Sequence, residues 1–241
     1  MTTWRIALVA VVLLGATLML SQCGGGSATV RYRVIATAEV DGQRVEGSTV
    51  MEAHFSHVEH SLIGAGGATR LYGEALILDL KGRGTVFMPP VRHYDKTVLM
   101  QIYEDGIPLT FGVRNSIGVM KDEDFARLRK AKGRRPLSFA PLNPPLRLPA
   151  FVAFRNEKIP NTIYEIDPQH MDSAFPGVRF ISLDIEITDA PLTKVLKQRL
   201  PWLASSTELF DRDPPGKQRD YKDRPLGYKI TYAHFFGDGS R

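Results

Sequence analysis

The sequence predicts a mainly β protein, an antiparallel β-sandwich-like body with two accessory helices. Three observations lead to this prediction. Apolar and polar residues alternate along several segments, as they do in strands with one buried face. Turn-forming residues such as Asp41-Gly42 separate these segments. Only Lys121–Lys132 and Pro191–Leu203 have the charge order or the apolar spacing of a helix.

The first 23 residues have the layout of an export signal. Arg5 precedes an apolar run from Ile6 to Leu20, and Cys23, the only cysteine of the chain, follows it. A positive start, an apolar stretch of about 7–15 residues and a short polar exit are typical of such signals. The segment Leu20-Ser21-Gln22-Cys23 resembles the lipobox of bacterial lipoproteins, which implies lipidation at Cys23, although Gln22 departs from the motif's small residue.

Three alternatives to a lipid anchor remain for this segment. It could be an uncleaved anchor helix, but its fifteen-residue apolar run is shorter than the about 20 residues that span a bilayer. It could be cleaved near Ser27-Ala28, or it could be a buried helix of the fold. All but the last place the body outside the cytoplasm, in the cell envelope and facing the periplasm.

The chain therefore divides into a signal or lipid-anchor segment (1–23), a flexible Gly/Ser tether (24–28) and a β-rich domain (29–241). The proline-rich segment 136–149 is the place where the domain could be subdivided. Because there is one cysteine, no intramolecular disulfide can form, and a large core must supply the stability. The net charge of +5 is a weak bias towards anionic surfaces, and we expect no nucleic-acid partner.

The strongest structural pattern is a hairpin. Val30–Val40 and Arg44–Phe55 both alternate, and Asp41-Gly42 between them tolerate the positive φ of a type I′ turn. A two-residue turn at this dipeptide sets a register in which opposite charges face each other and the apolar faces coincide. That register pairs Glu39 with Arg44, Arg31 with Glu52, Val34 with Thr49 and Tyr32 with Met51.

The remaining elements follow from the same patterns. Lys121–Lys132 begins with acidic residues and ends with basic ones, which matches the helix dipole. Pro136–Pro149 has five prolines in fourteen residues and cannot pair as an interior strand. Asp211–Gly227 is predicted to be a loop. Further strands are predicted at Arg70–Leu80, Thr85–Met88, Thr97–Glu104, Ile107–Arg114, Val178–Thr188 and Tyr228–Phe236.

Three histidines, His54, His57 and His60, raise the question of a metal site. Imidazole and carboxylate groups are common zinc and copper ligands, and Glu52 and Glu59 lie close in sequence. On a strand, however, His54 and His57 point to opposite faces. We therefore expect an exposed strand end or loop rather than a joint metal site or a pH sensor, and we expect no cofactor.

Six cations lie within nine residues: Arg127, Arg129, Lys130, Lys132, Arg134 and Arg135. We interpret them as a solvated helix end balanced by the acidic first turn of the same helix. The alternative is a patch that faces anionic lipid headgroups or acidic envelope polymers. In that case the partners would be the membrane, an envelope protein or an anionic polymer.

Other candidate residues have simpler interpretations. Asp184 and Glu186 share one strand face and could act as acid and base in glycoside chemistry, but outward carboxylates two residues apart are typical of a solvated face. The glycine-rich Gly64–Gly67 lacks the Lys-Ser/Thr pair of a phosphate-binding loop. The apolar groups of Leu200–Leu203 and Phe235-Phe236 are expected in the core, with a partner-binding ridge as the alternative.

Beyond the signal, Ile185-Glu-Ile-Thr-Asp-Ala-Pro191 and Leu200-Pro-Trp-Leu203 resemble segments of uncharacterised exported proteins of proteobacteria. This resemblance implies no function. We therefore expect a membrane-tethered extracytoplasmic β-rich protein with a binding or structural role in the cell envelope. The alternative is an envelope hydrolase or a metal-dependent enzyme.

Overall fold

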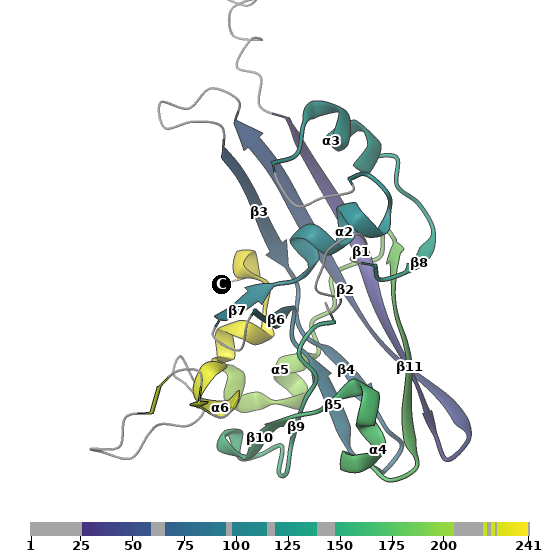
Figure 1. Cartoon of the computed structure of the whole chain (residues 1–241), viewed down its shortest axis with the longest axis vertical. Helices are drawn as coiled ribbons and strands as arrows, with labels where there is room; N and C mark the ends of the chain where they lie inside the picture. Colours follow the sequence, from purple (N-terminus) through teal and green to yellow (C-terminus); the bar gives the residue numbers. More distant parts are fainter. Residues whose placement is uncertain are drawn as a thin grey trace, which may run out of the picture.

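Two antiparallel sheets form the framework of the structure, a computed structural model that describes residues 26–58, 66–94, 98–114, 119–138, 148–204, 219–220, 223–224 and 226–240 (Figure 1). The larger sheet has the strand order β3-β2-β1-β11-β8 and the smaller one β10-β9-β5-β4, and β6 and β7 form a two-stranded ribbon. The strands are β1 Ser27–Val40, β2 Gln43–Val58, β3 Gly66–Tyr72, β4 Leu76–Asp79, β5 Thr85–Met88, β6 Val91–Tyr94, β7 Val98–Gln101, β8 Arg134–Pro136, β9 Val152–Phe154, β10 Ile163–Glu165 and β11 Val178–Ile187. The predicted mainly β class is confirmed.

The predicted hairpin is confirmed together with its register. β1 pairs with β2 so that Glu39 lies opposite Arg44 and Arg31 opposite Glu52. Asp41 and Gly42 at the turn have φ values of 48° and 80°. Arg31 forms the expected ion pair, with 2.7 Å between its Nη2 and Glu52 Oε2. Glu39 instead pairs with Arg179, because β11 flanks β1 on its other side.

The main core lies between the two sheets. Apolar side chains from one face of β1, including the fully buried Tyr32 and Val34, pack with Leu76 and Leu78 of β4 and with Val86 and Met88 of β5. All four residues of β5 are buried, because its other face supports a second core. Both faces of the smaller sheet are therefore buried: one packs against the larger sheet, and the other packs against the second core.

Short C-terminal helices cover that other side. Phe87, Val152 and Phe154 of the smaller sheet pack against a second apolar cluster that contains Leu196, Leu200, Leu203, Leu226, Ile230 and Phe235. These residues lie in or directly after α5 (Leu196–Arg199) and α6 (Leu226–Lys229), and in the 3₁₀ turns Pro201–Ala204 and Tyr232–Phe235. The prediction that Leu200, Leu203 and Phe235 belong to the core is confirmed.

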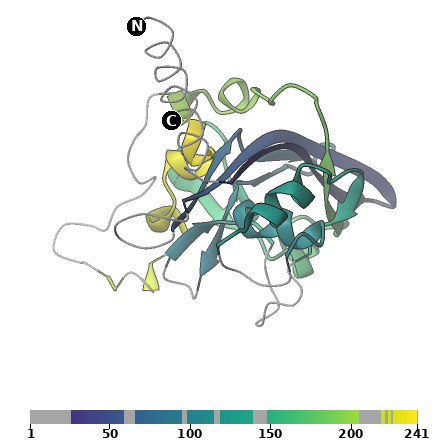
Figure 2. The ribbon, with the colours of Figure 1, turned by 90° about the horizontal axis from the view of Figure 1, so that it is seen from above.

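The segment after β11 crosses the outside of the larger sheet and reaches its far side (Figure 2). There the N–H of Thr193 donates to the Val50 carbonyl (3.2 Å), and the Val50 N–H donates to Thr193 Oγ1 (2.8 Å). Glu74, which is buried, then accepts the N–H groups of Val195 (2.5 Å) and Leu196 (2.8 Å) at Oε1. The carboxylate thus fixes the start of α5 to the connection between β3 and β4.

Several sequence predictions were wrong in type. Ile107–Arg114 was predicted as a strand but contributes to α2 (Tyr103–Thr110), since Pro108 cannot donate a ladder hydrogen bond. Tyr228–Phe236 was also predicted as a strand. Its apolar residues follow helical rather than alternating spacing, because Leu226 and Ile230 pack four residues apart on the second core.

Other predictions were right in type but wrong in extent. Arg70–Leu80 divides into β3 and β4, because Gly73 with a φ of 126° turns the chain from one sheet to the other. Of Lys121–Lys132, α3 occupies Asp122–Leu128. Of Pro191–Leu203, only Leu196–Arg199 is α-helical, because the preceding residues cross the sheet. Most of 136–149 and 211–227 lies outside the described residues. No helix in the described part of the chain is long and apolar enough to cross a bilayer.

Replacing Gly42 with Val should lower the free energy of unfolding by about 1 kcal/mol or more, because a β-branched residue resists positive φ. The control is Gly66→Val, since Gly66 is an exposed strand residue with open space around its Cα. Urea denaturation at neutral pH measures both. Equal stability of the two variants would contradict the type of turn assigned here.

Replacing Glu74 with Ala should lower the free energy of unfolding by about 1–3 kcal/mol, because two N–H groups of α5 lose their acceptor. Glu74→Gln keeps an oxygen at the same position and should recover most of that loss. Thermal and urea unfolding of both variants provide the measurement. If Ala and Gln were equally destabilising, the hydrogen bonds would not be the reason for the effect.

Candidate functional site

The end of the molecule at which β1 begins carries a group of exposed basic side chains and a cavity lined by two acidic residues. Helix α3 packs beside this strand start, on the same end of the sheet as the tip of β2 (Figure 1). Arg129 Nη1 donates to the Ser27 carbonyl at 2.5 Å, and the His57 N–H donates to the Gly26 carbonyl at 3.0 Å. The start of β1 is therefore held by α3 on one side and by β2 on the other.

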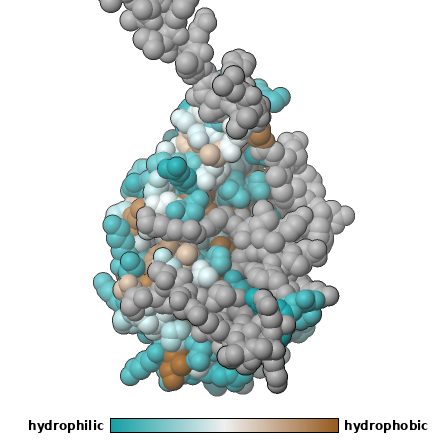
Figure 3. All heavy atoms as spheres, turned by 90° about the vertical axis from the view of Figure 1, so that its left-hand side faces the viewer, coloured by the Kyte–Doolittle hydropathy of each residue, from teal (hydrophilic) through white to brown (hydrophobic). Residues whose placement is uncertain are grey.

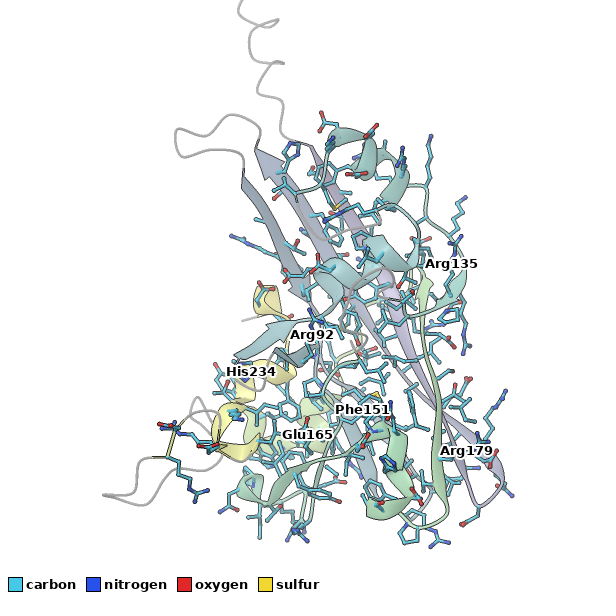
Figure 4. The ribbon with its side chains drawn as sticks, viewed as in Figure 1. Arg92, Arg135, Phe151, Glu165, Arg179 and His234 are labelled. Carbon is cyan, nitrogen blue, oxygen red and sulfur yellow. The ribbon has the colours of Figure 1, made fainter. Side chains whose placement is uncertain are left out.

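The six predicted cations divide into two groups. Arg134 donates to Asp184 Oδ2 (2.7 Å) and also reaches Glu46, and these hydrogen bonds raise the pKa of its guanidinium. Arg135, the middle residue of β8 (Figure 4), lies over the ring of Phe111, with its guanidinium carbon 5.4 Å from the ring centroid. The side chains of these two arginines therefore contact Asp184 and Phe111, away from the end of α3.

The other cations lie at the end of α3. Arg127, Arg129, Lys130 and Lys132 are exposed, and Arg127, Lys130 and Lys132 form no ion pair within the described residues. The acidic residues of α3 occupy its opposite end, where Asp124 Oδ2 accepts the Lys121 N–H as a cap. The acidic residues of α3 therefore lie at the start of the helix, and the basic residues lie at its end.

A cavity of about 360 Å³ opens next to α3, between β2, β3 and α2. Glu104 and Asp105 of α2 line it together with Arg114, Phe55 and Phe125. Burial raises the pKa of Glu104, and the neighbouring Asp105 and Asp238 carboxylates add to this effect. Burial likewise raises the pKa of Asp105, against the opposing influence of Arg114 and Arg92. This is a pair of adjacent carboxyl groups in a partly open cavity with a mixed polar and apolar lining.

The sequence reasoning missed this pair because it assigned Glu104 to the end of a strand and Ile107–Arg114 to another. Two adjacent acidic residues before a proline-containing apolar run are a helix start signal, since carboxylates are favoured in a first turn. That signal could have located α2. The folding of β2, β3 and α3 around it could not be read from local sequence.

The histidines are divided as the strand alternation predicts. His54 points outward, with Nε2 2.8 Å from Glu52 Oε1 and its ring against Tyr72. His57 is buried and stacks on Phe125, with 5.6 Å between ring centroids. The expected exposed strand end is therefore wrong for His57, because Phe125 of α3 covers this side of β2. His60 lies outside the described residues. Among the residues that are described, no three His, Cys, Asp or Glu side chains come together as metal ligands would.

The remaining candidates are structural. Asp184 and Glu186 are both in ion pairs, with Arg134 and Arg33 respectively. The expected solvated face is wrong for Asp184, which is buried because β8 pairs with β11 at this position. Trp202 donates its Nε1–H to the Glu157 carbonyl (2.7 Å) and packs edge-on against Phe154. On the face shown in Figure 3, hydrophobic residues are scattered among hydrophilic ones. The large exposed apolar residues that are described, Val119, Ile159 and Val195, belong to separate segments. No family model, curated protein or solved structure matches the chain.

The raised pKa values of Glu104 and Asp105 predict a pH dependence of stability. When folding raises the pKa of a carboxyl group, the stability contributed by its protonated form is fully present below the ordinary pKa, which is 4.5 for Glu104 and 3.8 for Asp105. That stability is lost as the pH rises through the pKa of the folded state. The double variant Glu104→Gln, Asp105→Asn should therefore be more stable than the natural chain near neutral pH. The difference should shrink as the pH falls towards 4.5.

Urea denaturation across this pH range measures the difference. The control is Glu123→Gln, which removes an exposed carboxylate of α3. A double variant that is less stable than the natural chain at neutral pH would contradict the burial argument. It would show that the ionised pair is held by Arg114 and Arg92 more strongly than burial opposes it.

Proposed function

We propose that the chain is a membrane-tethered extracytoplasmic protein with a binding or structural role in the cell envelope. The observation that carries this proposal is the apolar run Ile6–Leu20, which is followed closely by Cys23. Cys23 lies three residues before Gly26. Backbone hydrogen bonding of the β-rich domain begins at Gly26, and β1 begins at Ser27, so residues 26–28, which the sequence assigned to the flexible tether, belong to the domain. Signal and domain therefore join through a tether too short to contain another structural element.

The surface next to that junction supports a binding role. Arg127, Lys130 and Lys132 are exposed cations on or just after α3, the helix that contacts the start of β1 through Arg129. Basic side chains on a protein tethered to an envelope membrane attract anionic lipid headgroups and acidic polymers electrostatically. The fold supplies a rigid support, because α3 is packed on the main core through Phe125 and Leu128.

The second candidate function is an envelope hydrolase, and the cavity with Glu104 and Asp105 favours it. Carboxyl groups with raised pKa values in a concave site are candidates for proton transfer. Both residues come from one turn of α2, however, whereas acid and base pairs commonly face each other across a bound substrate. We therefore place this function second. Hydrolysis of envelope material that is abolished by Glu104→Gln would reverse the order.

The anchor is tested by replacing Cys23 with Ser. Because lipidation requires the thiol, the variant should leave the membrane fraction or accumulate as an unprocessed precursor. Ser21→Ala, which keeps a small residue in the same motif, is the matched control and should fractionate like the natural chain. Cell fractionation combined with intact mass of the membrane-extracted protein measures cleavage and acylation together. If Cys23→Ser were processed and fractionated normally, a plain anchor helix would be the better explanation.

A further inference from the structure

The cations of α3 and the attachment point of the tether lie at the same end of the molecule. Arg129 contacts the Ser27 carbonyl directly, and Lys130 and Lys132 follow it in the chain. The backbone of Gly26 lies so close to α3 that a Cβ at this position would clash with the side chains of Asp122 and Phe125. The position of these cations relative to Gly26 is therefore set by packing.

The length of the tether limits how far this end can be from the membrane. Cys23 and Gly26 are three residues apart, and an extended chain covers at most about 3.6 Å per residue, or about 11 Å in all. The attraction of cations to an anionic leaflet falls off within a Debye length of about 8 Å. A lipid chain on Cys23 therefore keeps this end of the domain within about one and a half Debye lengths of the membrane surface, so that tilting of the domain can bring the cations of α3 to the headgroups.

The charge at this end has the sign that an anionic leaflet attracts. Residues 121–132 have a net charge of +2, even with the acidic first turn of α3 included. The cations gather at the C-terminal end of that segment, and the described residues supply no carboxylate partner for Arg127, Lys130 or Lys132. Arg134 and Arg135 do not belong to this group, because they are turned towards Asp184 and Phe111.

We infer that Arg127, Arg129, Lys130 and Lys132 form a membrane-contacting surface that binds anionic lipid headgroups and holds the domain in one orientation on the bilayer. This inference rests on the proposed tether at Cys23. The long axis of β1 then points away from the membrane. The hairpin turn at Asp41-Gly42, fourteen strand residues from the start of β1, lies about 45 Å further out.

The test uses the full chain, reconstituted through its own anchor into two kinds of vesicle. One kind contains phosphatidylcholine alone, and the other an equimolar mixture of phosphatidylcholine and phosphatidylglycerol. Backbone amide exchange between Asp122 and Leu128 should be about tenfold slower on the anionic vesicles than on the neutral ones, because contact with headgroups opposes local opening of α3. Molar salt, which shortens the Debye length to about 3 Å, should remove the difference.

Two charge-reversal variants locate the effect. Arg127→Glu, Lys130→Glu, Lys132→Glu should abolish the protection on anionic vesicles. Arg44→Glu, Lys81→Glu, Lys158→Glu has the same change in charge on exposed residues away from α3, and it should leave the protection intact. Arg44 lies next to the hairpin turn, and Lys81 reaches Gln43 at that turn, so both mark the opposite end of the molecule, where Arg179 also lies (Figure 4).

The outcomes separate the surface from the tether. If the natural chain floats with neutral vesicles but α3 exchanges equally on both kinds, the tether stands and the membrane-contacting surface is overturned. If the chain floats only with anionic vesicles, and charge reversal on α3 prevents this, the surface is supported and the tether fails. Protection of α3 by a soluble acidic polysaccharide, with no response to anionic lipid, would also overturn the assignment to lipid.

Discussion

Because side chains alternate along a strand, the register of β1 against β2 decides which face of the larger sheet is apolar. The turn at Asp41-Gly42 sets that register, and Arg31 and Glu52 reinforce it on the outer face. The inner face then presents Tyr32, Val34 and Met51 to the smaller sheet. A shift by one residue would expose this apolar face and leave the smaller sheet without a partner.

The second constraint is the connection between β3 and β4, where the chain passes from one sheet to the other. Its backbone receives hydrogen bonds from the C-terminal segment, through Gly237 to the Gly73 carbonyl, and the Glu74 carboxylate receives two more from α5. Burial raises the pKa of Glu74, and the N–H groups of Val195 and Leu196 oppose this effect in part. The C-terminal helices are thereby attached to the same corner that joins the sheets.

The sequence was most informative where one local rule determined the structure. Asp41-Gly42 and the flanking alternation were sufficient to predict β1, β2 and their register, and Thr85–Met88 was predicted to the residue. Prediction failed where distant contacts decided the outcome. The C-terminal residues are helical because the second core accepts Leu226 and Ile230 at helical spacing. The cavity beside α3 combines α2 with β2 and β3, which are far apart in the chain.

The same reasoning explains how the six cations came to have different roles. In the sequence they form one run, and their composition predicts only a solvated, basic helix end. In the structure Arg134 begins β8, and pairing with β11 brings it to Asp184, whereas the residues before Gly133 remain on the end of α3. Strand pairing therefore removes two arginines from the run and leaves Arg129, at the end of α3, in contact with Ser27. A basic run that looks uniform in sequence becomes a surface with a defined position relative to the tether.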